Sequence, residues 1–131
     1  MNFKAKKCHF LIVTMGLFLL ISCDPVLDLS MEVSNNTSEK VVVEFKALHD
    51  QNKDTSFTMD IGQKVTLYSK SKWGKAKHFD CCSREFDSLK VITIDSTKTA
   101  VKNFKNEDNW LIENDKKKVK CTVIINNDDL K

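Results

Sequence analysis

The sequence has few of the residues that punctuate a chain or build a phosphate-binding loop. Its 131 residues include one proline, Pro25, and three glycines, Gly16, Gly62 and Gly74. It contains no glycine-rich loop of the kind that holds phosphate groups, and no G-x-S-x-G sequence that would present a serine nucleophile. Its carboxylates are scattered, so they single out no glycosidase pair. The sequence therefore offers no signature of these common enzyme classes.

The chain also lacks an apolar run long enough for a permanent membrane span. Its longest such run, residues 10–21, follows Lys4, Lys6 and Lys7 and has 12 residues. As a helix this run would measure about 18 Å, whereas a bilayer core is about 30 Å thick. A basic start, a short apolar run and a small residue, Ser22, predict a secretory signal peptide over residues 1–22. An uncleaved N-terminal anchor is the alternative.

Removal of the signal peptide leaves the chain without net charge. The three lysines of the leader belong to a total of 21 basic residues, so 18 remain against 18 acidic residues. The sequence pI of 8.6 thus describes the precursor. A neutral mature chain gives no indication of nucleic-acid binding.

The four residues at the end of the apolar run, Leu20-Ile21-Ser22-Cys23, resemble a bacterial lipobox. The resemblance implies cleavage between Ser22 and Cys23, transfer of lipid to the Cys23 thiol and acylation, for example with palmitate, of the new amino group. Two or more acyl chains would anchor the protein stably to a membrane. We expect a cell-envelope location, at the outer membrane, on its periplasmic or surface face, rather than at the inner membrane.

Apolar and polar residues alternate with period two along most of the mature chain, which is typical of half-buried strands. Strands are predicted over 27–33, 41–47, 57–61, 65–69, 89–95, 110–113 and 119–125, with a weaker edge strand over 97–104. We expect the first two strands and the last two strands to form hairpins. Residues 70–85 show neither period and predict a long loop.

Seven or eight short strands and no convincing helix predict an all-β fold. We expect a small antiparallel β-sandwich of immunoglobulin-like kind, after an N-terminal signal helix, with a small barrel as the alternative. The predicted organisation is a signal peptide over 1–22, a lipidated N-terminus and short linker over 23–28, and a sandwich domain over 29–131.

The layout of the chain resembles the small β-sandwich lipoproteins of Bacteroides-type bacteria. The resemblance lies in the lipobox, in the strand–NNT–strand opening from Glu32 to Phe45, and in the ending from Asn106 to Leu130. Those proteins are largely of unknown function. The resemblance therefore implies a fold and a location, and it implies no catalytic residues.

Three cysteines remain in the mature chain besides Cys23, in a compartment that permits disulfides. Cys121 lies on the same strand face as the apolar Val119 and Val123, so we expect it to face the core. We predict a disulfide from Cys121 to Cys82 or Cys81. It would close about 40 residues and contribute roughly 3–4 kcal/mol in the chain-entropy model. Three reduced thiols are the alternative.

A zinc site made of His78 and these cysteines is disfavoured, because adjacent cysteines rarely both reach one tetrahedral ion. We therefore expect no metal and no small-molecule cofactor. One stretch is both basic and aromatic and is a candidate contact with anionic lipid or with a polyanionic glycan. It contains Lys70, Lys72, Trp73, Lys75 and Lys77. The alternative is a solvated loop whose Trp73 covers the end of the sandwich.

The sequence thus predicts a non-enzymatic envelope lipoprotein, a tethered sandwich that binds a protein or glycan partner or serves a structural role. One alternative is a thiol, redox or hydrolytic enzyme that uses Cys81, Cys82 or His78. A reactive cysteine needs a nearby base and a lowered pKa, and no sequence pattern supplies these. Another alternative is a spacer, or an immunity protein that binds a toxin.

Overall fold

A computed structural model describes residues 26–49, 53–73, 85–115 and 117–131 of the chain. In these residues the alternating segments form seven strands, and no α-helix is present. Two single-turn 3₁₀ helices lie near the C-terminus. The elements are β1 (Val26–Asn35), β2 (Val41–Ala47), β3 (Thr55–Met59), β4 (Lys64–Trp73), β5 (Phe86–Thr93), η2 (Glu107–Asn109), β6 (Trp110–Asp115), β7 (Lys118–Ile125) and η3 (Asn127–Asp129).

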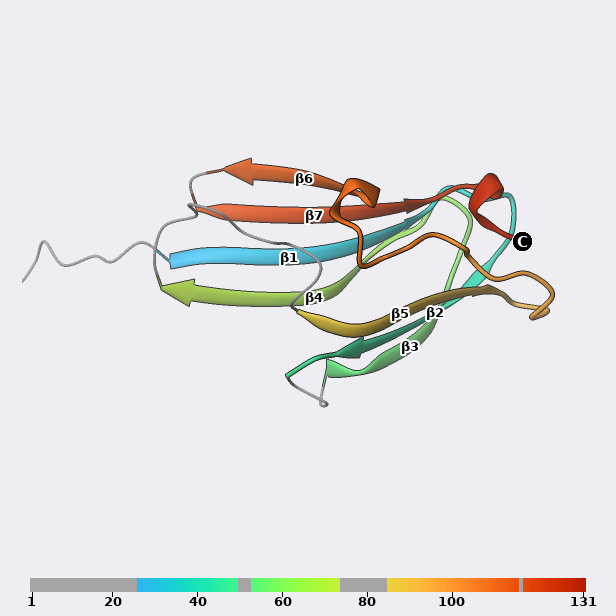
Figure 1. Ribbon diagram of the computed structural model, residues 1–131, viewed down its shortest axis with the longest axis horizontal. Helices are drawn as coiled ribbons and strands as arrows, with labels where there is room; N and C mark the ends of the chain where they lie inside the picture. Colours follow the sequence, from blue (N-terminus) through green and yellow to red (C-terminus); the bar gives the residue numbers. More distant parts are fainter. Residues whose placement is uncertain (1–25, 50–52, 74–84, 116) are drawn as a thin grey trace, which may run out of the picture.

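The strands form two sheets that lie face to face (Figure 1). One sheet has four strands in the order β4-β1-β7-β6, and the other has three in the order β3-β2-β5. The predicted all-β sandwich of about seven strands is therefore confirmed, in two sheets as in immunoglobulin-like domains. The strand order differs from that of a constant-type immunoglobulin domain, and β1 runs parallel to β7, so one pair departs from the antiparallel pattern. The predicted signal helix lies outside the described residues.

The predicted hairpin between the first two strands is wrong, because β1 and β2 belong to different sheets. Asn35, at the end of β1, is fully buried. Its Nδ2 donates to the carbonyl oxygens of Glu39 at 2.9 Å and Asp60 at 3.1 Å, and its Oδ1 accepts from the amide and hydroxyl of Thr37. A buried side chain with its hydrogen bonds satisfied in this way fixes the backbone. The Asn-rich segment is thus a corner between the sheets.

The predicted terminal hairpin is confirmed, since β6 pairs with β7 in antiparallel register. The predicted edge strand over 97–104 is wrong. Thr99 and Ala100 make only isolated bridges, and Thr99 exchanges backbone hydrogen bonds of 2.8 and 3.1 Å with Lys131. The segment is the connection that leads from β5 in one sheet towards β6 in the other (Figure 1). Its backbone groups are therefore satisfied partly by β5 and partly by the C-terminal residues, and not by one continuous ladder.

Both β1 and β4 are longer than predicted. β1 extends from Val26 to Asn35, one residue earlier and two later than the predicted strand 27–33, so the predicted linker over 23–28 overlaps the sheet from Val26 on. β4 continues to Trp73, so residues 70–73 are strand and not part of the predicted loop. Val26 pairs with Trp73, and Leu29 pairs with Lys70. The backbone of β1 supplies hydrogen-bond partners that the local sequence pattern of β4 does not reveal.

The core contains a row of aromatic side chains that joins the two sheets. Phe45 of β2 contacts Tyr68 of β4 and Phe86 of β5, with ring centroids 6.5 and 5.9 Å apart, and Phe86 contacts Trp110 of β6 at 6.0 Å. The Trp110 indole N–H donates to the Phe104 carbonyl at 2.9 Å. Tilted aromatic pairs at these separations are favourable in addition to the area that they bury. The row therefore fixes how the two sheets stack.

Candidate functional site

The outer face of the four-stranded sheet is a polar surface built by strand alternation. Along β1, Leu27, Leu29 and Met31 point into the core, which leaves Asp28 and Ser30 on the outer face. Neighbouring strands add residues at matching positions. Lys118 of β7 is in register with Asp28, and Lys120 is in register with Ser30. These residues lie far apart in the sequence and meet only through strand pairing.

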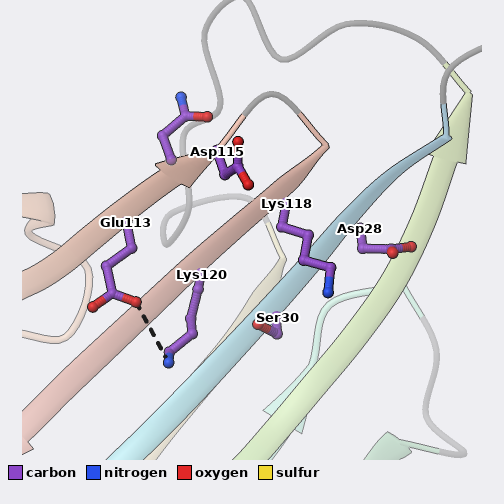
Figure 2. A pocket seen from close by; sticks show the side chains of 7 residues that line it. Asp28, Ser30, Glu113, Asp115, Lys118 and Lys120 are labelled. Carbon is purple, nitrogen blue, oxygen red and sulfur yellow. Dashed lines mark ion pairs between the residues drawn. The ribbon is translucent and has the colours of Figure 1, made fainter.

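Two adjoining hollows lie on this outer face. The first measures about 360 Å³ and extends from β1 over β7 to β6, and Figure 2 shows the side chains that line it. The second measures about 410 Å³ and extends from β1 over β4 and β7. They share Asp28, Ser30 and Lys118. Together they form a shallow polar groove across all four strands.

Lys120 lies between two carboxylates on this face. Its Nζ is 3.4 Å from Oε2 of Glu113, the pair that is dashed in Figure 2, and 3.6 Å from Oε2 of Glu32. The carboxylates of Glu32 and then Glu113 raise the pKa of the Lys120 ammonium above its ordinary value. The Glu32 oxygen is buried and has no hydrogen bond among the described residues. The outer face thus holds one ammonium group between two carboxylates.

The groove supplies hydrogen-bonding groups rather than a catalytic pair. The Ser71 hydroxyl donates to Oδ1 of Asp28 at 2.6 Å, and Ser69 and Ser30 line the same hollow. The described residues that line the two hollows are serines, carboxylates, lysines, one asparagine and one leucine, with no histidine to act as a base. Hydroxyls, ammonium groups and carboxylates together can bind a polar ligand such as a glycan or a peptide.

Lys70 and Lys72 do not belong to a surface loop, because they lie on β4 and turn towards the carboxylate of Glu85. The Nζ atoms of Lys70 and Lys72 are 3.9 and 3.1 Å from the Glu85 oxygens, and the Tyr68 hydroxyl donates to the same carboxylate at 3.3 Å. Glu85 itself is buried. The role of Glu85 is not foreseen from the sequence, because nothing there distinguishes it from Asp80 in the same basic stretch.

Trp73 lies on the face of β4 opposite to Lys70 and Lys72. It is 78% exposed, so it does not cover the end of the sandwich. Its neighbours in register place it in the row of outward-facing residues, beside Val26 at the start of β1. Of the five residues predicted to form one contact loop, the structure thus separates Trp73 from Lys70 and Lys72. Lys75 and Lys77 lie outside the described residues.

Cys121 is fully buried in β7 and is disulfide-bonded. The described part of the chain contains no second cysteine, so its partner lies outside that part. Pairing with Cys82 or Cys81 stays a prediction. The cleavage and lipidation residues Ser22 and Cys23, and His78, also lie outside the described residues.

Comparisons with known proteins find no similar chain. No protein-family model, no curated protein and no solved structure matches this sequence or fold.

Within the described residues, no helix is long and apolar enough to cross a bilayer. No cluster of three or more histidine, cysteine, aspartate or glutamate side chains there is arranged to hold a metal ion.

Proposed function

We propose that this protein is a lipid-anchored lipoprotein of the bacterial cell envelope, with a signal peptide over residues 1–22 and lipid on Cys23. The observation that carries the proposal is the position of the lipobox cysteine. Cys23 follows a short apolar run and stands three residues before Val26, where β1 begins. Cleavage before Cys23 would therefore remove no residue of the described sheet, which supports the proposal. We place the protein at the outer membrane.

The anchor is tested by expressing the full chain in a bacterium and measuring the mass of its N-terminal peptide. We expect a peptide that starts at Cys23 and carries lipid. Cys23→Ala removes the acceptor thiol and should leave an unlipidated chain. Cys8→Ala lies within the leader and is the matched control, with lipidation unchanged. A wild-type chain that keeps Met1 and carries no lipid would contradict the proposal.

The tethered sandwich serves, in this proposal, as a non-enzymatic binding or structural module, and the polar groove is its contact surface. Supporting this role are the two adjoining hollows, their mixed charges and their serine hydroxyls. Carboxylates, lysines and serine hydroxyls offer hydrogen-bonding groups to a protein or a glycan partner.

The contact surface is tested by placing a photocrosslinking residue at Ser30, in the groove, and separately at Ile61, which is exposed beyond the other end of β4. We expect a crosslinked partner, protein or glycan, from position 30 and none from position 61. Equal crosslinking at both positions, or crosslinking at position 61 alone, would show that the groove is not the contact surface.

A further inference from the structure

The exposed Trp73 lies at the end of the sandwich where the chain enters from Cys23. In register, Trp73 is the partner of Val26, the first residue of β1, and Val26 is itself 40% exposed. Three residue steps separate Val26 from Cys23, a reach of about 10 Å for an extended chain. Figure 1 shows the start of β1, the tip of β4 and the β6–β7 hairpin together at this end.

We propose that this end of the sandwich docks on the bilayer that holds the Cys23 lipid, with the Trp73 indole inserted at the headgroup level. The inference rests on the proposed lipid anchor and adds a second, side-chain contact with the membrane. A short tether keeps this end within reach of the headgroups. Tryptophan prefers that depth because its ring is apolar and its N–H is polar.

The neighbouring charges are of both signs, because the exposed carboxylates of Asp28 and Asp115 accompany two lysines at this end. Lys117 and Lys118 are exposed at the β6–β7 hairpin, and the Lys117 carbonyl accepts the amide N–H of Asp28 at 2.9 Å, which holds the hairpin beside β1. Lysines at a bilayer surface are attracted to anionic headgroups. Lys70 and Lys72 are directed to Glu85, so the membrane contact here is carried by Trp73 and the hairpin and not by the whole basic stretch.

The docked orientation has a measurable consequence, because the described residues contain one exposed and one buried tryptophan. Trp110 is 6% exposed and lies in the core, so it reports no contact with lipid. Ile61 is 60% exposed and precedes β4, whose ten residues span about 30 Å. A tryptophan at position 61 would therefore lie far from the bilayer if the sandwich stands on its Trp73 end.

The test uses the lipidated mature protein in vesicles of phosphatidylethanolamine and phosphatidylglycerol whose acyl chains are brominated, since bromine quenches nearby tryptophan. We expect the wild type to lose most of its Trp73 emission, relative to vesicles without bromine. The variant Trp73→Phe, which keeps Trp110, should lose almost none. The double variant Trp73→Phe, Ile61→Trp should also be unaffected.

Each other outcome overturns the inference. Wild-type quenching no greater than that of Trp73→Phe would show that Trp73 stays in water. Equal quenching at positions 73 and 61 would show that the domain has no preferred end. The mass of the Cys23 peptide, measured on the same sample, separates these failures from a failure of the proposed anchor. If that peptide carries lipid, only the docking inference falls, and if it carries none, both fall.

Discussion

At the residue scale, Asp95 organises the turn that follows β5. Its Oδ1 accepts hydrogen bonds from the Thr93 hydroxyl at 2.6 Å, the Thr97 hydroxyl at 2.8 Å and the Thr97 amide at 3.1 Å. Ser96, which lies between Asp95 and Thr97, has a φ of 59°, in the left-handed region that residues other than glycine adopt at a cost. The carboxylate thus stabilises a turn that the backbone alone disfavours.

These hydrogen bonds, that from the Thr93 hydroxyl above all, lower the pKa of the Asp95 carboxyl from 3.8 to about 2. A carboxyl whose pKa is lower in the folded state stabilises the fold above its unfolded pKa. That contribution is lost as the pH falls towards the folded pKa. The Asp95 contribution should therefore be complete about one pH unit above 3.8 and should decline as the pH falls through 3.8 towards about 2.

The variant Asp95→Asn tests this, because its amide does not titrate in that range. We expect the wild type to exceed the variant in free energy of unfolding at neutral pH, with a difference that shrinks as the pH falls towards 2. Urea titrations at a series of pH values measure the difference. A difference that is the same in acid and at neutral pH would show that the Asp95 charge makes no contribution.

At the element scale, the corner between β1 and β2 decides which sheet each strand joins. The segment Asn35-Asn36-Thr37 has the composition of a hairpin turn, and composition alone predicts a hairpin there. The structure differs because Asn35 is buried and bonded to Asp60, which precedes β4 in the sequence. That contact spans 25 residues, so no local pattern reveals it.

Substitution of the two neighbouring asparagines should separate a buried corner from an exposed turn. Asn35→Ala removes four hydrogen bonds and leaves buried partners unsatisfied, so we expect a loss of about 2–3 kcal/mol in the free energy of unfolding. Asn36→Ala, at an exposed position, removes one hydrogen bond, from the Ser34 hydroxyl at 3.2 Å, and should cost about 1 kcal/mol or less. Urea unfolding followed by tryptophan fluorescence measures both, and equal losses would argue against the corner.

At the scale of the whole molecule, packing links the two sheets, and the disulfide-bonded Cys121 lies within that packed core. The aromatic row contacts both sheets, and Cys121 lies in the same core, on the inward face of β7. The alternation along β7 correctly predicts that Cys121 faces inward. A buried, disulfide-bonded cysteine also makes a poor nucleophile, so the predicted pairing leaves only one of Cys81 and Cys82 as a thiol to test for reactivity.

Removal of the disulfide should lower stability without abolishing the packing pattern. We expect Cys121→Ala to reduce the free energy of unfolding by about 2–5 kcal/mol. Reductant should destabilise the wild type by a similar amount and leave the variant unchanged. Peptide mapping of the unreduced wild type would identify the partner cysteine. A wild type that is indifferent to reductant would count against a structural role for the bond.

For the groove, the sequence predicts which face each residue occupies but not which strands lie side by side. Alternation along β1 places Asp28 and Ser30 on the outer face, and alternation along β7 does the same for Lys118 and Lys120. These residues meet because β1 pairs in parallel with β7, which brings together the first and the last strand of the sequence. Glu85 could not be foreseen as the partner of Lys72, because the sequence pattern did not show that β4 reaches that far.

The sequence by itself determined the seven alternating strands that the structure contains, the inward faces of β1 and β7 and the terminal hairpin, and it carries the resemblance of residues 20–23 to a lipobox. These features depend on neighbours along the chain, so a local period or a short motif suffices to predict them. Only the tertiary structure decided the sheet order, the Asn35 corner, the Glu85 ion pairs and the exposure of Trp73. Each of these depends on backbone and side-chain partners that are distant in the sequence. Strand pairing and burial select those partners, because an unpaired backbone group or a buried charge is costly wherever the chain places it.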